Sequence, residues 1–205
     1  MRRRTVTLAR LSLLLAAGGA LSWWLGDSGA VRHGPGVVAP TTPTQTPVKG
    51  VAPFRYGDYA IQPLARFALQ ARVLGREDYR FDREAGLAPV DLALGWGPMS
   101  DERVLDQLSI TQGGRWYRWS AQQLPVSRSE IQHNSANMHM IPADETVAEA
   151  LDAVRDGQVV ELRGYLIEAH AADGWRWRSS LSRTDSGAHS CEVVYVEDLV
   201  IVGPG

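Results

Sequence analysis

The first 25 residues carry the feature that most restricts what this chain can fold into, a basic segment followed by an apolar one. "MRRRTVTLAR" contains four arginines and no acid, and "LSLLLAAGGALSWWL" at 11–25 is uncharged and mostly apolar. This order is typical of an export signal. A membrane-spanning helix needs roughly 20 apolar residues, and residues 5–9 can extend the run. Trp23 and Trp24 stand where an interfacial aromatic belt would lie.

Residues 1–26 are therefore predicted to be a signal anchor or a signal peptide. As an anchor they form a hydrophobic helix that crosses the cytoplasmic (inner) membrane once, and the positive-inside rule leaves the C-terminal domain periplasmic or extracellular. The alternative is cleavage after Ala30, since Ser28 and Ala30 are small as export cleavage sites require, and secretion of the remainder.

Composition divides the rest of the chain into a linker and one domain. Residues 27–53 are rich in Pro, Thr and Gly without apolar periodicity, which predicts an extended linker. Residues 54–205 are predicted to form one extracytoplasmic globular domain. Because Cys191 is the only cysteine, this domain must be stabilised by core packing and not by an internal disulfide.

The charge distribution argues against nucleic acid as a partner. The chain has 21 basic and 23 acidic residues, and 15 of the basic and 22 of the acidic ones lie after residue 54. This part of the chain is therefore acidic. A nucleic-acid-binding domain usually presents a concentrated basic face, and none is visible here.

The domain shows both strand and helix patterns. Alternating apolar residues predict strands at 65–73 and 90–96, and β-branched and aromatic residues predict further strands at 158–169, 175–178 and 191–202. Two short helices are expected. The first is capped by Ser100, and the second runs from Asp144 to a stop at Gly157 with an apolar stripe of Val147, Leu151 and Val154. The expected class is α+β with a curved antiparallel sheet.

The segment "GQVVELRGYLIEA" resembles the opening strand of small OB-type barrels. It combines a turn, a long strand and a mid-strand glycine, which lets a sheet coil. The resemblance covers about a dozen residues and implies an OB-like small barrel as the form of the curved sheet.

The stretch "HNSANMHMIPAD" at 133–144 combines histidines, asparagines and a carboxylate. The pattern has no helical period, so we expect a polar loop whose Asn and Ser side chains satisfy their own backbone and which leads into the second helix. The alternative is a metal site at His133 and His139, completed by Asp144 or Cys191, although no zinc signature with defined spacing is present. No cofactor is predicted.

Cys191 heads a predicted strand, and a buried, inert thiol is the default for a lone cysteine of this kind. The catalytic alternative makes Cys191 a nucleophile with His139 or His189 as base. Asn134 or Asn137 would orient that base, as in thiol hydrolases.

Arginine and tryptophan alternate in "WRWRSSLSR", so on a strand Trp175 and Trp177 share one face. Either the tryptophans pack in the core, or they form an exposed platform with guanidinium groups for a sugar ring or an anionic group. The predicted ligand-binding residues are Trp175, Trp177, Arg178, Arg183, Asp185 and Asn137.

No complete catalytic motif is present, and this favours a membrane-tethered, non-catalytic binding or interaction domain. A cell-envelope protein or glycan is the expected partner. An envelope hydrolase or transferase that uses Cys191 is the alternative from a different class, and the histidine metal site is a third hypothesis.

Overall fold

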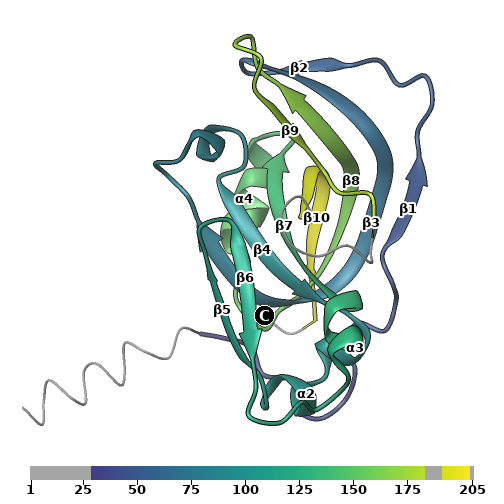
Figure 1. Ribbon diagram of the computed structural model, residues 1–205, viewed down its shortest axis with the longest axis vertical. Coiled ribbons are helices and arrows are strands. Elements are labelled where there is room, and N and C mark those ends of the chain that lie inside the picture. Colours follow the sequence, from purple (N-terminus) through teal and green to yellow (C-terminus); the bar gives the residue numbers. More distant parts are fainter. Residues whose placement is uncertain (1–28, 183–190, 204–205) are drawn as a thin grey trace, which may run out of the picture. The chain divides into compact units, whose positions relative to one another are not determined.

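A computed structural model of the chain describes residues 29–182 and 191–203 (Figure 1). Within these residues strands predominate over helices, and the expected α+β class with a curved sheet is confirmed. The hydrophobic helix expected at 1–26 lies outside the described residues. The strands are β1 (Thr44–Pro47), β2 (Phe54–Tyr56), β3 (Tyr59–Asp78), β4 (Val90–Gly95), β5 (Ser109–Gly113), β6 (Trp116–Ser120), β7 (Ser135–Pro142), β8 (Val159–His170), β9 (Arg176–Arg178) and β10 (Glu192–Val202). The helices are α2 (Glu102–Leu105), α3 (Arg128–His133) and α4 (Glu145–Ala153), with 3-10 turns at Arg83–Gly86 and Gly97–Ser100.

Five strands pair in a closed circuit, in the order β3, β4, β7, β10, β8 and back to β3. Four of these pairs are antiparallel, as expected. The fifth pair, β7 with β10, is parallel, so the expectation of a wholly antiparallel sheet is wrong for this pair. The chain reverses direction on both sides of β8, and β10 therefore runs the same way as β7. β1 and β2 pair with β3 outside the circuit, and β9 pairs with β8.

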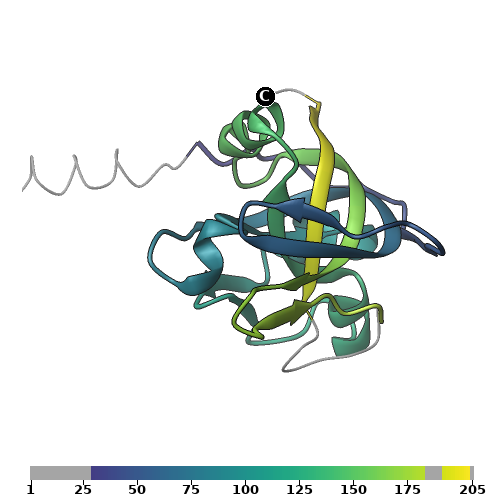
Figure 2. The same cartoon turned by 90° about the horizontal axis from the view of Figure 1, so that it is seen from above.

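The length and curvature of β3 close the circuit. Its residues 60–72 pair with β8, and residues 72–78 pair with β4. Register shifts interrupt β3 between Pro63 and Ala65 and between Val73 and Gly75. Such bulges bend a strand and increase its twist. Figures 1 and 2 show the result, a blue ribbon that curves past the green β8 and the yellow β10.

Gly164 in the middle of β8 lets two strands approach closely. A Cβ at this position would lie 1.9 Å from the carbonyl oxygen of Tyr195 in β10. The register of β10 shifts directly after this contact, between Val196 and Asp198. The segment whose mid-strand glycine suggested the opening strand of a barrel is therefore the fourth strand of the circuit in chain order.

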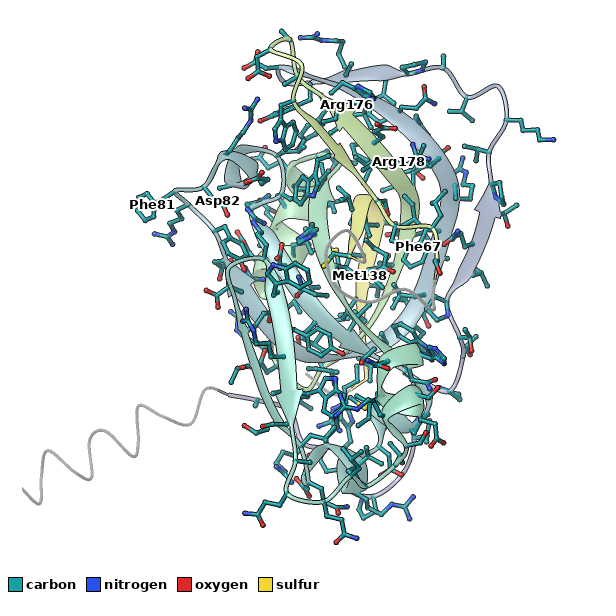
Figure 3. The ribbon with its side chains drawn as sticks, in the orientation of Figure 1. Phe67, Phe81, Asp82, Met138, Arg176 and Arg178 are labelled. Atoms are coloured by element: carbon teal, nitrogen blue, oxygen red, sulfur yellow. The ribbon has the colours of Figure 1, made fainter. Side chains whose placement is uncertain are left out.

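The interior of the circuit holds one core of alternating strand residues. It includes Phe67 and Met138, which Figure 3 shows among the strands. Helix α4 adds Val147 and Leu151, and its C-cap adds Val154, all at most 5% exposed, which confirms the predicted apolar stripe. Burial of these side chains supplies the main stabilisation of a domain that has no disulfide.

Both predicted helices are present, and their caps follow from local chemistry. The Asp144 side chain accepts a hydrogen bond from the backbone N–H of Val147 at 3.0 Å at the start of α4. The first helix, α2, is capped by Asp101 and not by Ser100. The sequence analysis did not predict α3, although Ser127 and Glu130 form a capping box at its start.

The range 27–53, predicted as a linker, contains segments that bond to the rest of the domain. The backbone N–H of Val31 donates to the carbonyl of Asp156 at 2.8 Å, and that of Gly97 donates to the carbonyl of Ala39 at 2.8 Å. Ala39 is fully buried, and β1 pairs with β3. A strand with few apolar residues can join a sheet because backbone hydrogen bonds hold it there.

The expectation of a polar loop at 133–144 is wrong, because Ser135–Pro142 forms β7 at the centre of the circuit. Met138 and Met140 face the core, while Asn137 and His139 face outward. The alternation has the period of a strand. The polar side chains on the outer face made this alternation hard to recognise in the sequence.

Candidate functional site

Three polar side chains on the outer face of β4 and β7 are almost completely buried. Asp91 is 0% exposed, and Asn137 and His139 are each 3% exposed. Asp91 lies directly opposite His139 across the two strands. The hairpin of β5 and β6 covers these residues, and Gln112 from that hairpin donates a hydrogen bond to Asn137 Oδ1 at 2.8 Å.

The Asp91 carboxylate collects three side-chain donors. Its Oδ1 accepts from Arg115 Nη1 at 2.9 Å and from His139 Nδ1 at 2.8 Å. Its Oδ2 accepts from Asn137 Nδ2 at 3.1 Å. A buried carboxylate is tolerable only when it is paired and hydrogen-bonded, and these partners meet that requirement. We call Asp91, Arg115, Asn137 and His139 the Asp91 cluster.

Arg115 connects the cluster to the loop between β3 and β4. It occupies the turn of the β5–β6 hairpin with φ of 67°, a left-handed conformation that is uncommon for residues other than glycine. Its Nε and Nη2 donate to Asp82 at 2.8 and 2.7 Å, and Nη1 also donates to the Ala88 carbonyl. The guanidinium lies 3.7 Å from the centroid of the Tyr79 ring. These contacts hold Arg115 in a backbone conformation that costs of order 1 kcal/mol or more.

The two aspartates also determine the ionisation of Arg115. Burial alone would lower the pKa of Arg115, but the hydrogen bond with Asp82 and the charge of Asp91 raise this pKa above its usual value. In return, the pKa of Asp82 lies below its ordinary range, chiefly because the guanidinium hydrogen-bonds its carboxylate. The guanidinium thus remains charged between the two carboxylates.

An aromatic layer lies against the cluster. The rings of Trp177 and His139 are 4.6 Å apart between centroids, and those of Trp175 and Trp177 are 6.0 Å apart. Both tryptophans are half-buried and pack on an outer apolar cluster. Arg176 and Arg178, on the opposite face of β9, are exposed, as Figure 3 shows. The face of β9 that carries Trp175 and Trp177 therefore packs on the domain, and part of each tryptophan side chain remains exposed to solvent.

The half-buried Cys191 lies beside the Asp91 cluster. Its Sγ is 4.0 Å from the carbonyl oxygen of Arg115, which also accepts a hydrogen bond from Asn137 Nδ2 at 3.2 Å. The Cys191 carbonyl accepts from the backbone N–H of Ser180 at 3.1 Å. The structure thus brings together Asn137, His139, Trp177 and Cys191, which sequence reasoning selected from three separate segments.

An open pocket of about 1000 Å³ shares Trp177 with this group. One wall is formed by β9 with Trp177 and Arg178, which the sequence analysis had singled out. The remaining lining residues are Glu168, Arg176, Ser179, Ser180, Leu181 and Ser182. Arg178 donates a hydrogen bond to Glu168, whereas Arg176 has no ion pair among residues 29–182 and 191–203, so the pocket presents hydroxyls, these two guanidinium groups and the edge of an indole ring.

The two histidines of the proposed metal site occupy different environments. His133 ends α3, is exposed, and lies 3.2 Å through Nδ1 from the hydroxyl of Ser129. His139 is bound to Asp91 inside the cluster. Over residues 29–182 and 191–203, no three histidine, cysteine or acidic side chains gather as a metal site would require.

Arg183, Asp185 and His189, which the sequence analysis also proposed as site residues, lie outside the described residues. Asn134, the other candidate to orient a histidine, donates instead to the Glu130 carbonyl at 2.8 Å.

Sequence reasoning missed Asp91 and Arg115. The signal for Asp91 was available, because it is the one charged residue in the apolar strand "VDLALG". An isolated acid in a buried strand needs a partner. No comparable signal marks Arg115 among the many arginines of the chain, because its role depends on the hairpin turn.

Comparisons with protein family models, with curated proteins and with solved structures each find no match to this chain. A search of the described part of the chain for helices long and apolar enough to cross a membrane finds none.

Proposed function

We propose that this chain is an extracytoplasmic binding domain, tethered to the cytoplasmic membrane by its N-terminal apolar segment, with an OB-like barrel and a ligand pocket beside β9. The observation that carries the proposal is the pocket lined by Trp177, Arg176 and Arg178, in which Trp177 contacts His139 of the buried Asp91 cluster. The cluster supports the wall of the pocket, since the His139 ring packs against Trp177 in a tilted arrangement, 4.6 Å between centroids. A fixed wall lowers the entropy cost of binding.

The strand circuit supports the OB-like part of the proposal. Five strands close a barrel in which the fourth and fifth strands exchange places, a Greek-key arrangement of the OB type. OB folds bind oligonucleotides and oligosaccharides on the face of strands 2 and 3 and on the loops after strands 1 and 4. In this chain strands 2 and 3 are β4 and β7. The loop after the fourth strand contains β9 and one wall of the pocket.

Pocket chemistry favours a glycan that carries carboxylate groups. The indole edge of Trp177 can contact the apolar face of a sugar ring, and serine hydroxyls can bond to sugar hydroxyls. Arg176 forms no ion pair with the described residues, whereas Arg178 is paired with Glu168. A guanidinium is suited to a carboxylate, which it can hold through two parallel hydrogen bonds. Nucleic acid fits poorly with the acidic balance of the domain.

Binding can be tested with the full chain purified in detergent. Soluble peptidoglycan fragments provide an anionic glycan, and chito-oligosaccharides provide an uncharged comparison. We expect saturable binding of the anionic fragments, measured by calorimetry, and a loss of about tenfold in affinity for Arg176→Gln, equal to about 1.4 kcal/mol. Arg163→Gln is the matched control, because Arg163 is an exposed strand arginine outside this pocket.

Two results would overturn the glycan proposal. One is the absence of saturable binding by the unmodified chain. The other is an equal loss of affinity in Arg176→Gln and Arg163→Gln, which would show a general effect of charge.

The tether is tested separately by the mass of the protein recovered from membranes of expressing cells. An intact N-terminus and resistance to carbonate extraction support the anchor. Loss of residues 1–30 and release into the soluble fraction would support the cleaved alternative.

A further inference from the structure

Three adjacent strands place a carboxylate, an imidazole and a thiol in sequence on one side of the sheet. Asp91 in β4 lies opposite His139 in β7, and His139 lies opposite Val193 in β10. Cys191 lies in a bend directly before β10, two residues from Val193. The contact of its Sγ with the Arg115 carbonyl places the thiol on this outer side.

The imidazole of His139 is oriented by its bond to Asp91. Nδ1 donates its proton to the Asp91 carboxylate, so Nε2 carries the lone pair and can accept a proton. The bond of Nδ1 to Asp91 fixes one edge of the ring toward β4, and β10 is the neighbour of β7 on its other side. His139 is 3% exposed, and within the described residues its Nε2 has no hydrogen-bond partner. His139 Nδ1 is thus held by a carboxylate while the lone pair of Nε2 stays open, the arrangement of a histidine that can accept a proton.

The thiol is also adjacent to the pocket. The carbonyl of Cys191 is bonded to Ser180, and Trp177 stacks on His139. Both Ser180 and Trp177 line the pocket. The pocket is thus joined to the thiol through Ser180 and to the imidazole through Trp177. Catalytic hydrogen bonds often form only in the complex with substrate.

We propose that Cys191 is the nucleophile of an acyl-transfer activity, with His139 as general base and Asp91 as the positioning residue for His139. The inference uses the pocket of the proposed function but does not require that its ligand be a glycan. The substrate class is an ester or amide with its acyl carbon at the edge of the pocket.

The reaction balances with the residues present and water. The proton of Cys191 moves to His139 Nε2 as sulfur forms a bond to the acyl carbon. The bond from that carbon to the leaving oxygen or nitrogen breaks, and the leaving group takes the proton from His139. Water then attacks the thioester with His139 as base, which releases a carboxylic acid and restores the thiol.

Charged and titratable groups face the cluster from several elements. The Asp91 carboxylate, from β4, accepts hydrogen bonds from His139 Nδ1 and from the Arg115 guanidinium of the hairpin. Asp82 faces Arg115 from the loop before β4. Tyr79 and Tyr117, the tyrosines nearest to the cluster, have pKa values raised mainly by burial, so both are neutral at pH 7. Asp91 is thus a charged group in direct contact with the imidazole.

The first experiment measures alkylation of the full chain by iodoacetamide between pH 5 and 9. An imidazole-assisted thiol is expected to react at a measurable rate below pH 7, in a step that His139→Gln removes, with at least a tenfold loss of rate at pH 6.5. His133→Gln, at an exposed histidine outside the cluster, is the matched control and should keep the profile. A single rise near pH 8.5, the value of an ordinary thiol, in the unmodified chain would overturn the proposal without reference to any variant.

The second experiment tests the acyl step with p-nitrophenyl acetate. We expect a mass increase of one acetyl group on Cys191 and a burst of p-nitrophenolate, both absent in Cys191→Ser. A reactive thiol that gains no acetyl group would overturn the acyl-transfer assignment. Neither experiment uses a glycan, and Cys191→Ser should still bind peptidoglycan fragments if the proposed binding function holds. The two proposals therefore fail on different results.

Discussion

Replacing Asp91 with alanine should destabilise the domain far more than replacing Asp82, although both carboxylates bind the same guanidinium. Asp91 is 0% exposed and accepts hydrogen bonds from Arg115, His139 and Asn137. Removing one partner of a buried ion pair costs about 3 to 5 kcal/mol, because the remaining charge stays buried without compensation. Arg115 keeps Asp82 after the substitution, so we expect about 3 kcal/mol, the lower end of this range, for Asp91→Ala.

Asp82→Ala is the matched control. The Asp82 side chain is 33% exposed, so water can replace much of its bond to Arg115. Pairs at the surface contribute less than about 1 kcal/mol. The full chain should be unfolded in urea, with tryptophan fluorescence and far-UV circular dichroism followed together. Coincident transitions justify comparing the two free energies of unfolding.

The expected order is a midpoint drop for Asp91→Ala at least three times that for Asp82→Ala, at an unchanged slope. A loss of less than about 1 kcal/mol for Asp91→Ala would contradict the reasoning, because it would mean that the buried donors find water or other partners. Equal losses for both variants would refute the assignment of Asp91 as the buried centre of the cluster.

Three further predictions concern the barrel, its N-terminal segment and its response to acid. Gly164→Ala should lower the free energy of unfolding by about 3 kcal/mol in the same urea assay, because a Cβ would lie 1.9 Å from a backbone oxygen that cannot move independently. Gly157→Ala places a side chain at φ of 83° and 1.9 Å from the carbonyl oxygen of Val31, so limited proteolysis near residue 31 should become faster while the barrel stays folded. Acid should destabilise the domain below about pH 4, the usual range of aspartate. The pKa values of Asp82 and Asp101 are lowered in the folded state by hydrogen bonds from arginine side chains, so their stabilisation is complete above the unfolded pKa and is lost as pH falls. Urea midpoints at pH 3 and pH 6 should differ less in a chain carrying Asp82→Asn and Asp101→Asn.

Strands with one apolar face and β-branched residues could be predicted from the sequence, and β4, β8 and β10 lie close to the expected ranges. β3 contains the expected 65–73 but extends beyond it at both ends. Helix α4 was predictable because its cap and apolar stripe are local. β7 was not, since its outward residues are the polar Asn137 and His139. Their burial depends on a hairpin that begins more than twenty residues earlier in the chain. The parallel pairing of β7 with β10 likewise depends on the path of the whole chain.

Part of the candidate site could also be predicted from the sequence, because the types of its residues are a local signal. His139, Asn137, Trp177 and Cys191 stood out as residue types that carry chemistry or recognition, and the fold brings them to one place. The group that orients His139 was expected to be an asparagine and is the carboxylate of Asp91. A sequence alone can reveal a carboxylate in an apolar strand, but it cannot reveal which residue is the partner of that carboxylate.

Arg115 shows what no local pattern could indicate. Its backbone turns the hairpin, its carbonyl contacts Asn137 and Cys191, and its guanidinium joins Asp82 to Asp91. These contacts come from four segments that only the closed barrel brings together, and each of them helps to hold a left-handed backbone that an arginine would otherwise avoid. The same contacts keep the hairpin over the outer face of β4 and β7. Without that cover Asp91 and His139 would be open to water, and the imidazole would lose the dry environment that makes its bond to the carboxylate strong. The strained turn is therefore best understood as part of what fixes His139 next to the pocket.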